Sequence, residues 1–305
     1  MDKNTTTDSI RKFGRVVILG RPNTGKSTLL NAIMQQKVAI TSPLPQTTRK
    51  NQRVVFEDER GTIIFSDTPG VLGKVVDLIG KRVNTEAPKE TSRADIIVCL
   101  VDVSREKSDE ENKVLGIIRK SNAKKILVYN KIDQAEGPAN HRADYNYLED
   151  EFNGYIEISA LKEKFVKGLI KMIFEMLPDS KQEEIENDAE IMTNKDKPKM
   201  GMDSKDFIAE IIREKAYLYL RREVPYSVNV VVDAIQDKKK IIVIKASIYT
   251  TADRYKKMII GKDGRKIRDI GFNARKELEL MSSRKVFLEM TVKTDAHWME
   301  RDIEK

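Results

Sequence analysis

The stretch GRPNTGKST, residues 20–28, decides the fold of the N-terminal half of this chain. It lies between the apolar run RVVIL, which predicts a strand, and the apolar run LLNAIM, which predicts a helix beginning at about Lys26. In the pattern G-x-x-x-x-G-K-S, backbone N–H groups and the helix N-terminus surround phosphates, Lys26 reaches the β and γ oxygens, and Ser27 ligates Mg²⁺. The alternative is a chance glycine loop, which the flanking strand and helix make the weaker interpretation. The loop alone does not distinguish ATP from GTP.

The composition is that of a globular chain with two domains. The chain has 305 residues, 40% of them hydrophobic, and a single cysteine. Cys99 lies in the apolar run DIIVCLVDV, so it is expected to pack in the core rather than to act as a nucleophile. The first fourteen residues lack the apolar segment of a signal peptide, and no run reaches the roughly 18 apolar residues of a membrane span. We therefore expect a cytoplasmic protein.

The net charge of +8 is distributed unevenly along the chain. Residues 1–178 carry +5, residues 179–205 carry −3 and residues 206–305 carry +6. The acidic stretch has few apolar residues and no sustained periodicity, which is typical of a linker. We therefore predict a first domain over 1–178, a linker over 179–205 and a second domain over 206–305. The basic second domain is where an anionic partner would bind, although a modest positive balance is more often only a solvated surface.

Apolar strands and amphipathic helices alternate through the first domain. Strands are predicted at residues 15–20, 54–58, 62–67, 94–102, 124–130 and 155–159, and helices at 28–34, 112–120 and 165–177. Such alternation is typical of an α/β fold with a mostly parallel sheet and helices on both faces. The short turn between the second and third strands predicts a hairpin with one antiparallel strand at the sheet edge. Ligands of such folds bind at the carboxyl ends of the strands, where the following motifs lie.

The motif DTPG, residues 67–70, follows the third predicted strand. Asp67 is suited to hold Mg²⁺ through water, and Gly70 can bring its N–H close to a γ-phosphate because it has no side chain. An ordinary turn is the alternative, and it becomes weak once the motif follows a phosphate loop.

The motif NKID, residues 130–133, selects the base. Asp133 can accept two hydrogen bonds from the N1–H and the exocyclic amine of guanine, a pattern that adenine does not offer. Asn130 can reach O6 and N7 of the base while its other contacts brace the loop. The segment SAL, residues 159–161, is expected to close over the base with backbone N–H groups. The order of these motifs predicts a GTPase.

Two further features concern hydrolysis. The segment TSPLPQTTR, residues 41–49, is either a plain surface loop or a switch whose Thr48 meets Mg²⁺ and the γ-phosphate only in the triphosphate state, with Thr47 as the competing residue. Val71 stands where many GTPases carry the Gln that orients the attacking water. Asn23 is therefore a candidate either to hold K⁺ near the β–γ bridge or to brace the loop with its own side chain.

The last hundred residues carry a different pattern. Helices are predicted at 207–223, 254–260 and 267–281, and strands at 227–235, 241–249 and 285–293, in the order αββααβ. The turn GKDG, residues 261–264, joins two of the helices, and from Arg254 to Arg268 there are seven basic residues and one acid. A G-x-x-G turn in this place lets the backbone approach nucleic-acid phosphates, as in KH domains. RNA binding is favoured over a plain interhelical turn, with Ile259 and Ile260 as an apolar floor beneath the bases.

Taken together, the motifs resemble the Era family of bacterial GTPases, in which a Ras-like domain precedes a type II KH domain. The resemblance runs from GRPNTGKST, PQTTR, DTPGV, NKID and SAL to AEIIREK, EVPYSVNV, IIGKDGRKI and KVFLEMTVK. It implies an α/β P-loop GTPase domain followed by an α+β KH domain, and hydrolysis of GTP to GDP with Mg²⁺. It further implies binding near the 3′ end of 16S rRNA, maturation of the small ribosomal subunit, and loose association with the membrane. We expect a monomer.

The residues that match the family motifs give the predicted sites. The predicted catalytic residues are Lys26, Thr48, Asp67 and Gly70, and the predicted metal ligands are Ser27, Thr48 and Asp67. GTP contacts are predicted for Gly20, Asn23, Thr24, Gly25, Lys26, Ser27, Thr28, Asp67, Thr68, Pro69, Gly70, Asn130, Lys131, Asp133, Ser159 and Ala160. RNA contacts are predicted for Ile259, Ile260, Gly261, Lys262, Asp263, Gly264, Arg265 and Lys266.

Three features depart from the family pattern. Thr24 stands where the family usually has Val, and its side chain is expected to face away from the phosphates. Residues 181–203 do not resemble the family linker, and the acidic tail from Asp295 leaves only Trp298 as a candidate for RNA stacking. The alternatives still open are an RNA-binding scaffold without turnover, a P-loop ATPase, and a GTP-regulated protein directed at another RNA or the membrane. NKID argues against the ATPase, and competition between GTP and ATP would separate the two.

Overall fold

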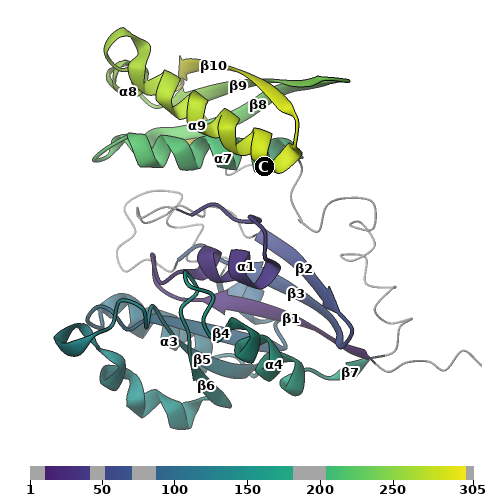
Figure 1. Ribbon diagram of the computed structural model, residues 1–305. Helices are drawn as coiled ribbons and strands as arrows, with labels where there is room; N and C mark the ends of the chain where they lie inside the picture. The colour runs from purple at the N-terminus through teal and green to yellow at the C-terminus, as the bar shows by residue number, and fades with distance from the viewer. Residues whose placement is uncertain (1–10, 42–51, 71–86, 181–203, 300–305) are drawn as a thin grey trace, which may run out of the picture. The chain divides into compact units, whose positions relative to one another are not determined.

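A computed structural model describes residues 11–41, 52–70, 87–180 and 204–299 (Figure 1). The chain divides into two compact units, one containing most of the described residues up to 180 and the other containing those from 204 onward. Helix α7 begins at Ser204, and the two-residue strand β7 covers Asp179–Ser180, so regular structure lies just inside both ends of the predicted linker. The domain boundaries themselves stay a prediction.

The first unit contains a seven-stranded sheet among its described residues. Five strands of its main path are β2, β3, β1, β4 and β5 in spatial order, followed by β6 at the far edge. Their bounds are β1 Arg11–Leu19, β2 Gln52–Asp58, β3 Gly61–Asp67, β4 Ile96–Asp102, β5 Lys124–Asn130 and β6 Gly154–Glu157. β2 pairs antiparallel with β3, β7 pairs antiparallel with the start of β1, and the other pairings are parallel. The predicted mostly parallel sheet with an antiparallel edge hairpin is confirmed.

Helices cover both faces of this sheet, and the alternation of side chains along β1 shows why. Val16 and Ile18 point into a core with the helices α1 (Lys26–Met34) and α4 (Val166–Met176). Val17 and Leu19 point to the opposite face, into a core with the helix α3 (Asp109–Arg119) and the 3₁₀ helix η2 (Arg142–Glu151). Successive residues of a strand face opposite sides, so a strand buried on both sides becomes a continuous apolar run. Cys99 is buried in the second of these cores, as predicted.

The structure differs from the sequence prediction at several element ends. α3 begins at Asp109, three residues before the predicted start, because Ser108 and Glu111 form a capping box. β6 ends at Glu157, two residues before the predicted end. The 3₁₀ helices η1 (Gly137–Ala139) and η2 were not predicted, because their sequences are polar and have no sustained apolar period.

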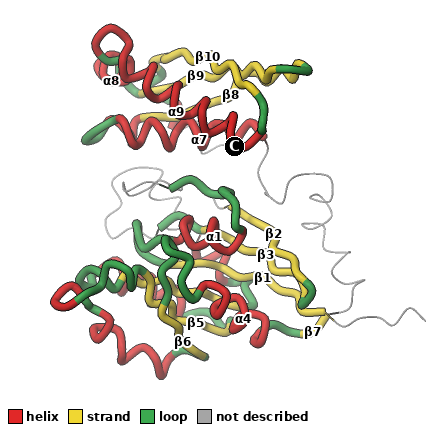
Figure 2. Tube along the Cα trace, in the orientation of Figure 1, coloured by secondary structure: helices red, strands yellow, loops and turns green. Residues whose placement is uncertain are grey.

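The second unit has the predicted order αββααβ. It contains α7 (Ser204–Tyr219), β8 (Val228–Lys238), β9 (Ile241–Thr250), α8 (Asp253–Ile260), α9 (Arg265–Ser282) and β10 (Lys285–Thr294), with short 3₁₀ turns η3 (Val224–Ser227) and η4 (Lys262–Gly264) (Figure 2). The sheet order is β10-β9-β8, with β10 parallel and β8 antiparallel to the central β9.

The helices of the second unit pack on one face of its sheet (Figure 1). Every second residue at the start of β8 is buried against them, namely Val228, Val230 and Val232. The matching stripe on α9 has helical spacing, with Ile270, Ala274 and Leu278 buried. The opposite sheet face is open, and Phe287 on β10 is 54% exposed there. Within the part of the chain that the structure describes, none of the helices has the length and apolar character required to cross a membrane.

Candidate nucleotide and RNA sites

The phosphate loop joins β1 to α1 and is shaped by close packing. Asn23 and Gly25 have positive φ values of 63° and 98°. A Cβ on Gly25 would lie 2.4 Å from Nδ2 of Asn130, and a Cβ on Gly20 would lie 2.5 Å from the Leu100 carbonyl oxygen. Neighbouring atoms therefore require glycine at both positions, and the left-handed backbone requires it at Gly25 as well.

Lys26 is the buried cation of this loop. Its Nζ donates hydrogen bonds to the carbonyl oxygens of Gly20 at 3.1 Å and Arg21 at 2.8 Å. Burial lowers the pKa of Lys26 to about 8, although the charge of Asp67 acts in the opposite direction. Removal from water disfavours the ammonium form, and a bound phosphate would favour it again. The loop thus holds a cation whose charge a nucleotide would stabilise.

Asp67 and Ser27 meet the requirements of a Mg²⁺ site. The Ser27 hydroxyl donates to Oδ2 of Asp67 at 2.7 Å, while Oδ1 of Asp67 is buried and has no hydrogen-bond partner among the described residues. Burial raises the pKa of Asp67 to about 6, despite the nearby charge of Lys26. A buried carboxylate oxygen without a partner is costly, and a divalent cation would relieve that cost. A hydroxyl and a carboxylate are oxygen ligands of the kind that Mg²⁺ prefers.

The DTPG motif lies directly against the phosphate loop. The Thr68 hydroxyl donates to the carbonyl oxygen of Ile18 at 2.9 Å, which ties the motif to β1. A Cβ on Gly70 would lie 2.7 Å from the Pro22 nitrogen, so only glycine permits this approach. Three predicted features, Thr47, Thr48 and Val71, lie outside the described residues.

Asn130 connects the NKID motif to two other loops. Its Nδ2 donates to the Thr24 carbonyl oxygen at 2.8 Å, and its Oδ1 accepts from the Ala160 amide at 2.9 Å. In this structure the Asn130 side chain braces the neighbouring loops, which is one of the two roles predicted for it. The Ala160 N–H donates to Asn130 here, and closure of the SAL backbone N–H groups over the base stays a prediction. The Thr24 side chain is fully buried and donates to the Arg21 carbonyl oxygen at 3.1 Å.

Asp133 is oriented by the SAL segment. The Ser159 hydroxyl donates to Oδ1 of Asp133 at 2.5 Å and accepts from the Lys162 amide at 3.0 Å. This contact fixes the direction of the carboxylate at the carboxyl end of β5, which is the group predicted to recognise guanine. The predicted phosphate, metal and base residues among the described part of the chain therefore lie on neighbouring loops at one edge of the sheet.

Sequence reasoning missed the residues that support the phosphate loop from outside. Nε of Arg21 lies 2.5 Å from Oε1 of Glu111, and both side chains are buried. Arg21 also donates to the Ser108 hydroxyl at 3.0 Å and to the Glu106 carbonyl oxygen at 3.1 Å. The capping-box pattern S-x-x-E at Ser108 and Glu111 was a readable signal for the helix end. The ion pair with Arg21 depends on tertiary structure and leaves no such pattern.

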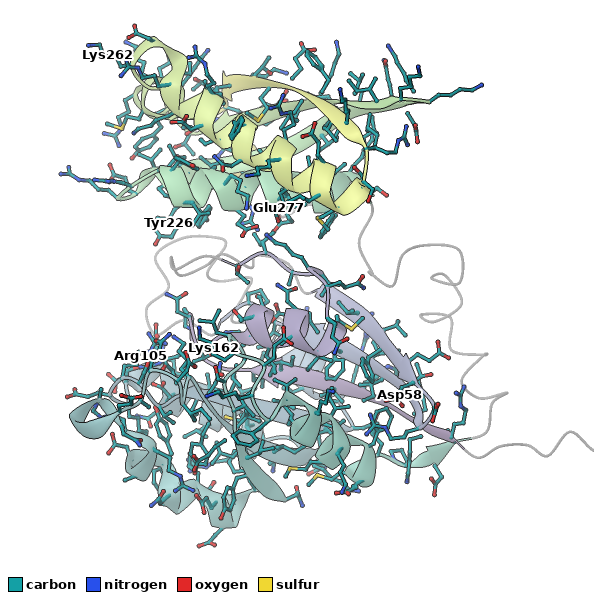
Figure 3. All side chains as sticks on the ribbon, in the orientation of Figure 1. Asp58, Arg105, Lys162, Tyr226, Lys262 and Glu277 are labelled. Carbon is teal, nitrogen blue, oxygen red and sulfur yellow. The ribbon has the colours of Figure 1, made fainter. Side chains whose placement is uncertain are left out.

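The GKDG turn is open where the phosphate loop is closed. Gly261 and Gly264 have positive φ values of 73° and 71°, and Asp263 has a φ of 52°. A Cβ on Gly264 would meet nothing closer than 4.0 Å, so its surroundings are open. Lys262 is exposed at the turn between α8 and α9 (Figure 3). Five further basic residues nearby are also exposed, namely Arg254, Lys257, Arg265, Lys266 and Arg268.

Two predicted RNA contacts are wrong. Ile259 is fully buried in the core of the second unit, so it cannot form an apolar floor for bases. Ile260 is half-buried and stays a candidate. Trp298 is 3% exposed and its Nε1 donates to the Ser227 carbonyl oxygen at 3.0 Å, so this ring is a core residue and not a stacking platform.

Two protein-family models match the chain. The one described as 50S ribosome-binding GTPase matches residues 15–131, and the one described as KH domain matches residues 223–298. With the phosphate loop, the oriented Asp133 and the GKDG turn, these matches define a P-loop GTPase joined to a KH domain.

Relatives specify the family. The chain is 36% identical to the GTPase Era of Borreliella burgdorferi strain ZS7, over 95% of this chain and 97% of that protein. It is 36% identical to the GTPase Era of Thermotoga maritima, over 95% of this chain and 94% of that protein. The chain therefore belongs to the GTPase Era family, and it is a GTPase; the resemblance inferred from the motifs is confirmed.

Solved structures of this family match over nearly the full chain. A variant of Aquifex aeolicus Era bound to GDP·AlF4⁻ has a TM-score of 0.83 at 33% identity, over 95% of this chain and 96% of that chain. A structure of Era in complex with MgGDPNP and nucleotides 1506–1542 of 16S ribosomal RNA has a TM-score of 0.83 at 34% identity, with the same shares. The predicted fold class is confirmed for both units.

Proposed function

We propose that this GTPase binds the 3′ end of 16S rRNA through its KH domain and uses GTP binding and hydrolysis during assembly of the small ribosomal subunit. The observation that carries the RNA part is the basic GKDG turn, in which the surroundings of Gly264 are open and exposed lysine and arginine side chains lie nearby. The related Era that was solved with nucleotides 1506–1542 of 16S rRNA supports the choice of RNA.

The nucleotide part rests on the contacts around Asp67 and Asp133. Ser27 and Asp67 are proposed to hold Mg²⁺ together with Thr48, and Asp133 is proposed to accept from guanine. Lys26 and Gly70 are proposed to stabilise the γ-phosphate. Support comes from the buried, unpartnered Oδ1 of Asp67 and from the Ser159 hydrogen bond that orients Asp133. Related Era structures contain GDP·AlF4⁻ and MgGDPNP.

The RNA proposal is tested by titrating the full-length protein, loaded with GDPNP, with an RNA equivalent to nucleotides 1506–1542 of 16S rRNA. A shuffled RNA of the same length and composition is the control. Because backbone contacts are independent of sequence and base contacts are not, the rRNA segment is expected to bind more tightly than the shuffled one. Equal affinity for the two RNAs would contradict the rRNA assignment and favour an RNA of another sequence.

We also propose that Asn23 holds K⁺ near the β–γ bridge and so supplies positive charge where Gln is absent after DTPG. Intrinsic turnover is expected to be no faster than about 10⁻³ s⁻¹, the range of GTPases without an activating partner. K⁺ is expected to accelerate hydrolysis relative to Na⁺, and Asn23→Ala to remove the difference. Equal rates of the unchanged protein in the two salts would contradict the K⁺ proposal and favour the loop-bracing role of Asn23.

The proposed ribosomal partner determines the cellular location that we propose for the protein. Work on the small ribosomal subunit implies a cytoplasmic protein that acts as a monomer, with at most peripheral association with the membrane. Sedimentation of cell extracts should place the protein in the small-subunit fractions when GDPNP is present. Its absence from those fractions would argue against this partner.

A further inference from the structure

A buried carboxylate lies between the two halves of the nucleotide site. Asp102 ends β4, and its side chain is fully buried. Its Oδ2 lies 2.8 Å from Nε of Arg105 and 2.7 Å from Nζ of Lys131. Its Oδ1 accepts from the amide and the hydroxyl of Ser104, at 3.1 Å and 2.6 Å. Both oxygens are thus engaged, and one of them is shared by two cations.

The two cations lead to different halves of the site. Nη2 of Arg105 donates to the carbonyl oxygen of Pro22 at 2.7 Å, and Pro22 belongs to the phosphate loop. Pro22 is also the residue against which Gly70 packs. Lys131 is the second residue of NKID and has a positive φ of 68°. Asp102 is therefore linked, through one side chain on each side, to the phosphate loop and to the base-recognition segment.

The negative charge of Asp102 holds Lys131 and Arg105 in their present positions. Burial opposes ionisation of Asp102, but its contacts with Lys131, Ser104 and Arg105 keep its pKa below the ordinary value, so it is a carboxylate at neutral pH. Lys131 and Arg105 are both partly exposed, with side chains 25% and 40% accessible. Without the buried charge, each cation would gain more from solvent than from its present position. Loss of the Asp102 charge should therefore release both loops.

We propose that Asp102 is a positioning residue that holds the phosphate loop and the NKID segment in register, so that the base and the phosphates of one nucleotide are bound together. This role goes beyond the residues proposed to touch nucleotide and rests on that proposed function. The competing interpretation is a buried ion pair that only stabilises the fold. The two differ in base discrimination, because general destabilisation does not change how well Asp133 distinguishes one base from another.

The experiment measures equilibrium Kd values of the full-length protein for GDP and for IDP, whose base lacks the exocyclic amine. Asp102→Asn is expected to raise the Kd for GDP about tenfold and to lower the ratio of the IDP and GDP Kd values several-fold. Arg105→Gln is expected to raise both Kd values by a similar factor and to leave the ratio unchanged, because Arg105 links Asp102 to the phosphate loop and not to the NKID segment. Arg119→Gln, which breaks the exposed ion pair with Glu151 on the same unit, is the matched control and should change neither quantity.

An unchanged Kd for GDP in Asp102→Asn, or a raised Kd with an unchanged ratio, would overturn the proposal. If Asp102→Asn does not fold, Lys131→Met provides the second test, since it removes only the cation on the base side. Lys131→Met must then lower the ratio while Arg105→Gln does not, and equal ratios in the two variants would overturn the proposal. Failure of the unchanged protein to bind GDP would instead refute the proposed function.

Discussion

The phosphate loop and the GKDG turn both place glycines before a helix, yet they are held in different ways. The phosphate loop is buried, and side chains from distant segments brace it, including Asn130 on Thr24 and Arg105 on Pro22. The GKDG turn is held by its own backbone, with the Gly261 amide bonded to the Lys257 carbonyl oxygen at 2.9 Å and the Gly264 amide to Gly261 at 3.2 Å. The first is a loop braced by distant side chains, and the second is an exposed turn.

This difference determines what each glycine is for. In the phosphate loop a side chain would collide with protein, so a substitution damages the pocket before any ligand arrives. In the GKDG turn a side chain on Gly264 would meet open space, so a substitution there carries the cost of the left-handed backbone but no collision, and its main effect falls on what approaches from outside. The comparison predicts that changes in the two loops produce separate losses, of nucleotide binding and of RNA binding.

The largest effect is expected from Gly25→Ala. The left-handed backbone costs about 1–2 kcal/mol for a residue with a Cβ, and the contact with Asn130 at 2.4 Å must also give way. With a buried hydrogen bond lost as well, GTP affinity should fall about a hundredfold by equilibrium titration. The control is Gly116→Ala, in the middle of α3, where a Cβ meets nothing within 4 Å. It should leave GTP affinity unchanged and stabilise the fold by about 0.5–1 kcal/mol. Similar GTP affinity in the two variants would contradict the claim that the phosphate loop requires glycine at position 25.

Asp133→Asn is expected to act on base choice. Loss of the charged acceptor should weaken GTP at least about tenfold, with a gain for xanthosine triphosphate, whose C2 oxygen can accept from the amide. Competition titrations with the two nucleotides measure both effects. Unchanged GTP affinity without a gain for the xanthine nucleotide would remove Asp133 from the site.

The raised pKa of Asp67 predicts a pH dependence of Mg²⁺ binding. With a pKa of about 6, Asp67 is ionised at pH 7 and mostly protonated at pH 5, so apparent Mg²⁺ affinity of the GTP complex should fall about tenfold over that range. Without ligands, the folded pKa exceeds the ordinary value, so stability from this group is present below pH 4 and is lost as pH rises to about 6. Asp67→Asn should flatten both profiles, in calorimetric titration and in thermal unfolding. If Mg²⁺ affinity and stability still vary with pH in the same way in Asp67→Asn, the pH dependence belongs to another group.

The smallest effect is expected from Lys262→Ala. Its exposed ammonium group supplies charge to the phosphate path without specifying a base, so affinity should fall for all RNA sequences alike. The slope of log K against log salt should decrease in magnitude by about 0.7, the value for one single-strand phosphate contact. A change confined to one RNA sequence would show that Lys262 contacts a base.

The strands and motifs of the nucleotide site were predictable from sequence because their signals are local. The runs around Val16 and Cys99 are apolar without interruption, as expected for strands buried on both faces, and GKS, DTPG and NKID each follow such a run. The bracing residues were not predictable. Asp102 and Arg105 touch partners on other loops, and only the folded chain brings them together.

The errors in the second unit have a related cause. Ile259 and Ile260 are neighbours in a helix, and the sequence does not say which of them faces the core; the structure buries Ile259. Trp298 follows the last strand in an acidic tail, and its indole N–H finds the Ser227 carbonyl oxygen, far away in sequence. An apolar residue near a binding motif can lie either in the core or on the surface, and only the packing of the folded chain determines which.

The central claim is that one chain carries a braced nucleotide loop and an exposed RNA turn that fail independently, and Gly264→Asp tests it most directly. Asp tolerates the left-handed conformation of this position better than most residues, and the open surroundings accept its side chain, so the fold should persist. We predict that affinity for the RNA equivalent to nucleotides 1506–1542 of 16S rRNA falls at least about tenfold, while GTP hydrolysis without RNA is unchanged. Gly264→Asn, which has the same shape without the charge, should lose less. A Gly264→Asp protein that binds this RNA as the unchanged protein does would contradict the account.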